Sequence, residues 1–199
     1  MTAPGCQPDV EWRDPRLESH PLLRELVAFA IDVDPVNRLD TFGEGLGLFL
    51  TPNPPDVRYR TTPDNSVTFA RTGGDGVHFG LLCLDHTNTA DWPVVMTVPT
   101  NFDNPRVVVG ATLHEFLCLG YHVGWFPIEQ VSYTGGEGAW SDMQRLQNGD
   151  PDWLSDKRTR SLITVRKRFA LSPWPDVKRR LHELRRDLLP LVQAPPQDE

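Results

Sequence analysis

The chain has 199 residues, 39% of them hydrophobic, and a net charge of −7. This length suits a single domain with a sizeable core. No run of eighteen apolar residues occurs, and the opening stretch, MTAPGCQPDVEWRD, lacks the basic start and apolar run of a secretory signal. We therefore expect a cytoplasmic protein without a membrane span.

The N-terminal part is predicted to be helical after a loose arm. Residues 1–18 are polar and contain proline, so we expect them to be unstructured. A proline suited to the first helical turn and a wide apolar face predict a helix over Ser19–Ile31. A short second helix is predicted from Asp34-Pro35 to about Gly43. The glycines and prolines of FGEGLGLFLTPNPPD then predict an irregular segment that leads to a sheet.

The middle of the chain is predicted to form the sheet. Its runs of β-branched and aromatic residues are Val57–Arg60, Ser66–Arg71, Val77–Leu84, Trp92–Pro99 and Val107–Val109. The glycine-rich stretch Thr72–Gly76 predicts a hairpin turn with positive φ angles. Because the connections are short, we expect antiparallel pairing.

Helices are predicted for the rest of the chain. Thr112 and Glu115 have the spacing of a capping box, and Gly120 ends the helix that they begin. The aromatic-rich residues 121–135 are expected to cover one end of the core, with Trp125 and Phe126 packed inside, and 134–138 to form a loop. Basic helices are predicted over Asp156–Phe169 and from Val177 to Leu188. A disordered tail is predicted over 193–199.

These elements predict an α+β fold. We expect a mostly antiparallel curved sheet of about four to six strands, packed against helices, with N-terminal and C-terminal helices outside it. The arm, residues 1–18, would precede a single domain over 19–192.

Two motifs have a chemical and a structural interpretation. His114 and Cys118 lie one helical turn apart, as in a zinc-protease motif, but the motif has no third ligand and the capping box already accounts for its glutamate. The loop Thr72–Gly76 resembles a phosphate cradle, but it joins two strands and carries Asp75, which favours a tight turn. Cys6, Cys83 and Cys118 have no disulfide or metal spacing, so we expect free thiols.

The charge is unevenly distributed. Residues 1–156 hold 22 acids and 9 bases, whereas residues 157–187 hold 11 bases and 3 acids. The basic helices could bind nucleic acid or an acidic partner, or neutralise the acidic body across the fold. Since no aromatic residues alternate with these bases, the pattern favours neutralisation over nucleic-acid binding.

Three stretches between about residues 66 and 119 carry a resemblance to a known family: TFARTGGDGVHFGLL, WPVVMTVPT and VVVGATLHEFLCLG. Their order of strand, glycine-rich turn, two further strands and short helix resembles the SUKH superfamily, which includes the SMI1/KNR4 domains. A SUKH-like core would span about 20–135, with a helical extension over 156–190. The resemblance implies a curved antiparallel sheet and a non-catalytic role, as an adaptor or as a bacterial immunity protein that neutralises a toxin.

We therefore expect a protein-binding module without catalytic residues, cofactor or metal, and homo-oligomerisation stays open. Candidate partner-binding residues are Asp75, His78, Trp92 and Trp140, because exposed aromatics are enriched at interfaces. The alternative is a hydrolase-type enzyme whose site is assembled from Asp75, His78, Asp91 and His114. A third hypothesis is nucleic-acid binding through the basic C-terminal helices.

Overall fold

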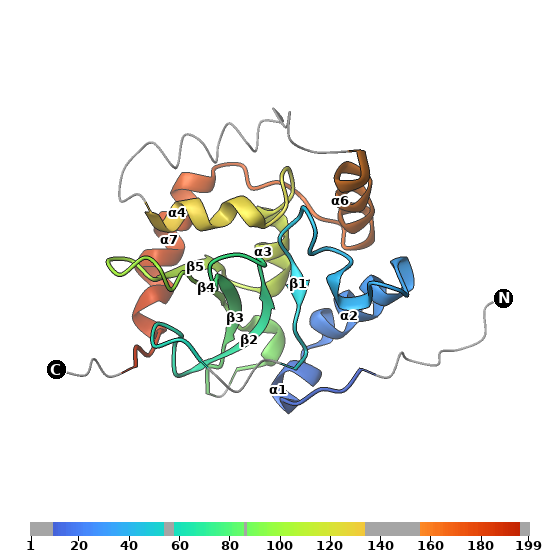
Figure 1. Ribbon diagram of the computed structural model, residues 1–199. Coiled ribbons are helices and arrows are strands. Elements are labelled where there is room, and N and C mark those ends of the chain that lie inside the picture. Colours follow the sequence, from blue (N-terminus) through green and yellow to red (C-terminus); the bar gives the residue numbers. More distant parts are fainter. Residues whose placement is uncertain (1–9, 54–57, 86, 134–155, 196–199) are drawn as a thin grey trace.

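A five-stranded antiparallel sheet lies at the centre of the protein (Figure 1). The computed structural model describes residues 10–53, 58–85, 87–133 and 156–195. The strands are β1 (Phe49–Leu50), β2 (Ser66–Arg71), β3 (His78–Leu82), β4 (Val94–Thr97) and β5 (Arg106–Gly110), and they follow one another across the sheet in sequence order. This arrangement confirms the predicted α+β class and the antiparallel pairing.

The edge of the sheet differs from the prediction. Residues 58–60 form no strand, and residue 57 lies outside the described residues. The edge strand is β1, in the segment that was expected to be irregular, where Phe49 pairs with Arg71 and Leu50 with Ala70. Gly45 and Gly47, with φ angles of 87° and 72°, allow the turn that leads from η1 into β1.

Helices α2 (Pro21–Val33) and α3 (Leu113–Leu119) contribute to the core on one side of the sheet. Phe116 of α3 is fully buried and contacts the rings of Phe69 on β2, Phe79 on β3 and Trp125. Aromatic side chains bury large apolar areas, so this cluster joins the sheet to its covering helix.

The predicted caps are present. The hydroxyl of Thr112 accepts the backbone N–H of Glu115, and the Glu115 carboxylate accepts the N–H of Ala111, one residue earlier than in the usual capping box. Gly120 ends α3 as predicted. At the start of α2, His20 Nδ1 accepts the N–H of Leu23.

The prediction of a loose arm over residues 1–18 is wrong for its last residues. Pro15–Glu18 form the short helix α1, and its Leu17 is fully buried in the core. Asp14 caps this helix by accepting the N–H of Arg16. Residues 1–9 of the predicted arm lie outside the described residues.

The basic helices are α6 (Asp156–Arg168) and α7 (Val177–Leu188), on opposite sides of the sheet in Figure 1. Just after α6, Phe169 meets Phe29 of α2 edge to face at 5.6 Å, and α7 packs on β5. Beyond α7, the N–H of Gln193 donates to the side-chain carbonyl of Asn65 at 2.9 Å. The prediction of disorder from residue 193 is therefore wrong for Gln193, because this bond ties it to the segment before β2.

Short elements complete the described part of the chain: η1 (Arg38–Asp40), η2 (Thr89–Asp91), η3 (Phe126–Glu129), α4 (Gln130–Tyr133) and η4 (Leu189–Leu191). The helix predicted from Asp34 to Gly43 is only η1, preceded by a turn that Asp34 caps. Among the described residues, no helix has the length and apolar character needed to cross a membrane.

Candidate binding site at one end of the sheet

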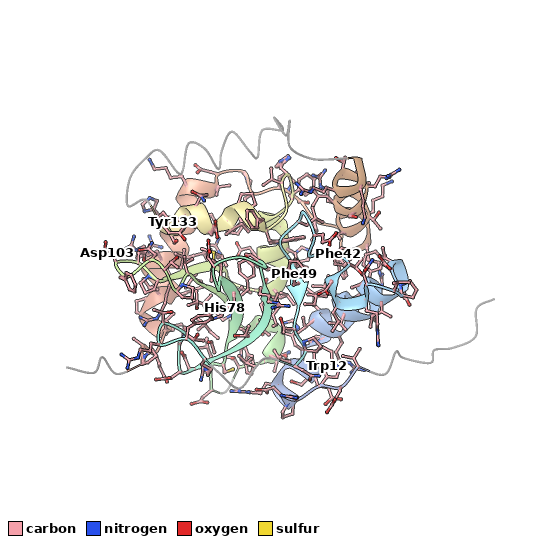
Figure 2. The ribbon with its side chains drawn as sticks, in the orientation of Figure 1. Trp12, Phe42, Phe49, His78, Asp103 and Tyr133 are labelled. Carbon is pink, nitrogen blue, oxygen red and sulfur yellow. The ribbon has the colours of Figure 1, made fainter. Side chains whose placement is uncertain are left out.

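Two hairpin turns lie at the same end of the sheet. His78 pairs with Thr97, and Thr97 with Arg106, so residues 72–77 and 98–105 emerge side by side. Elements η3 and α4 cover this end: a Cβ atom on Gly74 would lie 3.8 Å from the Phe126 ring, and the hydroxyls of Thr100 and Tyr133 are 3.0 Å apart. In Figure 2, Asp103 and Tyr133 lie near each other at the edge of the molecule.

The glycine-rich turn has the predicted geometry. Gly73, Asp75 and Gly76 all have positive φ angles, of 91°, 48° and 72°. Glycine adopts such angles freely, and aspartate tolerates them better than most residues. Gly76 also allows a close approach, because a Cβ atom there would lie 2.5 Å from the Tyr59 hydroxyl. The loop is therefore a tight turn against which Tyr59 packs.

A pocket of about 290 Å³ lies beside this turn. Its walls come from the segment before β2, from β2 itself and from the turn, and they include Arg58, Tyr59, Thr62, Thr68, Arg71, Asp75 and His78. Arg71 and His78 are direct cross-strand partners, so their side chains start from the same face of the sheet. The segment before β2 folds over this face, where the Arg106 Nε donates to the carbonyl of Thr61 at 2.8 Å.

His78 is a neutral, structural side chain at the base of the pocket. Its Nδ1 lies 2.8 Å from the carbonyl oxygen of Gly76, which can only accept, so Nδ1 carries the proton. Its Nε2 therefore accepts from the Thr62 hydroxyl at 3.0 Å, and the Tyr59 ring stacks on the imidazole at 5.7 Å. Burial, and then the charge of Arg58, lower the pKa of His78 below its usual value of 6.5.

This environment predicts acid sensitivity. The folded protein keeps His78 neutral, while the unfolded chain protonates it near pH 6.5. The unfolded state then holds more protons, so we expect the free energy of unfolding to fall as the pH drops below about 6.5. Urea unfolding at several pH values, of the wild type and of His78→Gln, measures this. The variant should lose less stability over the same range, and an unchanged pH slope would contradict the assignment.

The four residues of the enzyme hypothesis do not converge. Asp75 and His78 share the pocket, but Asp91 precedes the opposite end of β4. His114 lies on α3, on the side of the sheet that Phe79 faces, whereas His78 points to the other side. The assembled hydrolase-type site is therefore a wrong prediction, because the sheet separates its histidines.

The zinc-protease-like motif is explained by helix packing. His114 Nε2 donates to the carbonyl of Phe169 at 3.1 Å, and its Nδ1 lies 3.8 Å from the Cys118 sulfur. No three His, Cys, Asp or Glu side chains of the described ranges gather as a metal site would require. Cys83 and Cys118 are free thiols, and burial raises the pKa of both.

The predicted partner-binding residues differ in their exposure to solvent. Asp75 is exposed, whereas His78 and Trp92 are 7% and 6% exposed, so the structure contradicts a surface role for these two. The Trp92 indole donates to the Thr87 hydroxyl at 2.9 Å. Trp140 lies outside the described residues.

The two aromatics that were predicted to lie in the core also differ. Trp125 is buried as predicted, but Phe126 is 48% exposed, which contradicts its expected place in the core.

Sequence reasoning missed other exposed groups at this end. Phe102 is 87% exposed and Tyr133 is 43% exposed. An isolated phenylalanine within the turn-forming sequence PTNFDNP was the available signal for Phe102, because such a residue has no strand or helix face to bury it. No local sequence pattern indicated that Arg58 and Arg71 line a common pocket, because they meet there only when the segment before β2 folds over the sheet.

Two carboxylates lie close together on this surface. The pKa of Glu129 is raised, first by partial burial and then by the negative charge of Asp75. These groups come from η3 and from the glycine-rich turn, and Asp103 adds an exposed acid on the neighbouring turn. A cationic group placed near Asp75 and Glu129 would relieve their repulsion.

The sequence of the chain matches no protein-family model, and no curated protein matches it.

Proposed function

We propose that the protein is a non-catalytic binding module of adaptor or immunity type, whose contact surface is the end of the sheet described above. The sheet-end surface consists of Asp75, Phe102, Asp103, Phe126, Glu129 and Tyr133. The observation that carries the proposal is Phe102, a large apolar side chain that is 87% exposed at the tip of a well-bonded turn. Aromatic side chains of this kind anchor protein interfaces.

Hydrogen bonds hold the turn that carries Phe102. The side-chain amides of Asn101 and Asn104 both donate to the carbonyl of Ser132 on α4, the second at 3.4 Å. The N–H of Asn104 donates to the side chain of Asn101 at 3.1 Å. A turn fixed in this way presents its aromatic side chain in one place, which lowers the entropy lost on binding.

The charge of this surface favours a basic partner. The acids Asp75, Asp103 and Glu129 lie on the same elements as the exposed aromatics or on the neighbouring turn, in a chain with a net charge of −7. Electrostatic complementarity speeds encounter and selects among partners more than it adds affinity. A lysine or arginine of the partner near Asp75 and Glu129 would also favour the charged form of Glu129, whose pKa is raised in the free protein.

The resemblance to the SUKH superfamily supports the same proposal, since its members include adaptors and toxin-neutralising immunity proteins. The enzyme alternative has no comparable support, because both nitrogens of His78 are engaged in hydrogen bonds.

Ion pairs weaken the nucleic-acid alternative. Arg168 pairs with Glu25 at 2.7 Å, and Arg180 pairs with Glu115 at 2.7 Å, so the basic helices neutralise the acidic body in part.

Phe102→Ala tests the surface. We expect this variant to lose affinity for the partner by about tenfold or more, because a central aromatic anchor contributes more than 1 kcal/mol. The partner is first recovered from the natural host with the immobilised full chain, and its affinity is then measured by calorimetry. The matched control is Val36→Ala, which removes an 89% exposed side chain just beyond α2.

The proposal also predicts the character of the partner. It should carry a basic contact surface, and its affinity should fall as salt is raised, because salt screens exposed charges. Asp75→Asn should weaken binding while leaving the fold intact, since asparagine tolerates the positive φ angle at this position. Equal affinities for the Phe102→Ala and Val36→Ala variants would contradict the proposed surface.

A further inference from the structure

The pocket beside the glycine-rich turn has a character different from that of the sheet-end surface. Among its lining residues are two arginines, Arg58 and Arg71, and one acid, Asp75. In an acidic chain, two arginines that line one small cavity form a local site for negative charge. No carboxylate of the described ranges forms a salt bridge with either arginine.

Arg58 is anchored in a way that suits ligand binding. Its Nη2 donates to the backbone carbonyls of Pro63 and Ser66, the second at 3.2 Å. A guanidinium group has five N–H donors in a rigid fork, so anchoring through one nitrogen orients the others. Arg71 comes from β2, and its guanidinium lies 5.7 Å from the centre of the Phe49 ring. Both arginines thus have supports that limit their motion.

The remaining walls suit a small organic body. The Tyr59 ring, which is 52% exposed, provides apolar surface, and Thr51 and Thr68 provide hydroxyl groups. At the turn, Gly74 leaves room for a ligand, since the atom nearest to a Cβ placed there would be 3.8 Å away, whereas Phe49 and Tyr59 already lie against Gly73 and Gly76. A volume of about 290 Å³ is near the lower end for small-molecule sites, which corresponds to a body of about one ring.

We propose that this pocket binds a small organic anion, whose carboxylate or phosphate group is held by Arg58 and Arg71 and whose apolar body lies against Tyr59. Arginine forks match both anionic groups in geometry. The two positive charges outweigh the single negative charge of Asp75. His78 contributes no charge, since its ring is neutral and both nitrogens already bond to Thr62 and Gly76. The His78 ring stacks on the Tyr59 ring and so holds Tyr59 in place.

The test uses three one-ring probes: benzoate, phenyl phosphate and neutral benzamide. Each is titrated into the full chain at constant ionic strength and followed by calorimetry and by backbone amide NMR. We expect saturable binding of at least one anion, with shifts concentrated at Tyr59 and at Gly73–Gly76. The tighter of the two anions identifies the preferred group, and benzamide should bind much more weakly because it lacks charge.

Variants separate the pocket from general electrostatics. Arg71→Gln and Arg58→Gln should each weaken anion binding about tenfold or more, because each removes charge-assisted hydrogen bonds. Arg179→Gln removes the same charge from a side chain that is 71% exposed on α7 and should leave the affinity unchanged. The Arg58 side chain also donates to two backbone carbonyls, so Arg58→Gln can disturb the fold. In that case the affinity of the Arg71→Gln variant decides the test, because Arg71 is exposed and makes no such bond to the backbone of the described residues.

Asp75→Asn distinguishes this inference from the proposed function. The variant removes a negative charge from the pocket, so the anion should bind several-fold more tightly, whereas a basic protein partner should bind more weakly. The inference is overturned if neither anion saturates, if benzamide binds as tightly as the anions, or if Arg179→Gln weakens binding as much as Arg71→Gln. None of these results bears on whether Phe102 contacts a protein.

Discussion

Phe116→Ala is expected to lower the free energy of unfolding by about 3–5 kcal/mol, the range for removing a fully buried phenylalanine. Phe116 is 0% exposed, and its ring lies 4.7 Å from that of Phe79 and 5.9 Å from that of Phe69. The truncation would leave a cavity between α3 and the sheet that their backbones cannot close. Urea unfolding followed by tryptophan fluorescence and circular dichroism measures the loss.

The control for this prediction is Phe102→Ala, which removes the same ring from an 87% exposed position. We expect this change to alter the stability by less than about 0.5 kcal/mol, as exposed substitutions do. A loss below about 1 kcal/mol for Phe116→Ala, with an unchanged dependence on urea, would show that the cluster does not join α3 to the sheet.

Gly47→Ala is expected to cost about 2–4 kcal/mol, the sum of a left-handed backbone and a steric clash. Gly47 has a φ angle of 72°, and a Cβ atom there would lie 2.5 Å from the backbone nitrogen of Phe126. That backbone is fixed, because the carbonyl of Leu46 accepts the N–H groups of Trp125 and Phe126 at 2.5 and 3.0 Å. The same urea titration measures the cost.

Gly74→Ala is the matched control for this substitution. A Cβ atom on Gly74 would have its nearest neighbour at 3.8 Å, on the Phe126 ring, and the φ angle is not in the left-handed region. We expect a change within a few tenths of a kcal/mol, since alanine also restricts the unfolded chain. Similar costs for both glycines would refute the close contact between Gly47 and η3.

Locally encoded elements were predicted well from the sequence. The hairpin of β2 and β3 follows from two runs of β-branched and aromatic residues around a glycine-rich turn, and the start of α3 follows from Thr112 and Glu115. In each case residues close in the chain make the decisive contacts. Their structure therefore depends little on the rest of the fold.

Elements that depend on distant partners were not predicted. The two residues of β1 form a strand only because β2 offers a free edge, and their own sequence is flanked by glycines and prolines. Leu17 is buried because α1 meets the core, which a polar, proline-containing segment does not indicate. Tertiary contacts outweighed local composition in both places.

The candidate site was only partly visible in the sequence. Asp75 was identified from its turn, and it lies on the exposed surface. Trp92 and His78 were expected to be available to a partner, but an indole or imidazole whose nitrogens find internal partners packs inside. Arg58 lies before β2, whereas Glu129 and Tyr133 lie on the continuous stretch of η3 and α4, so no local spacing in the sequence links Arg58 to the other two.

We propose that the sheet-end surface binds a basic protein partner. Placing the photo-crosslinker benzoylphenylalanine at position 102, and separately at 133, in the natural host tests it most directly. We expect both positions to capture the same protein, which carries a basic surface, and the crosslinker at position 36 to leave that protein uncaptured. Capture of that protein only from position 36, or of no protein from positions 102 and 133, would show that the sheet-end surface is not the contact surface.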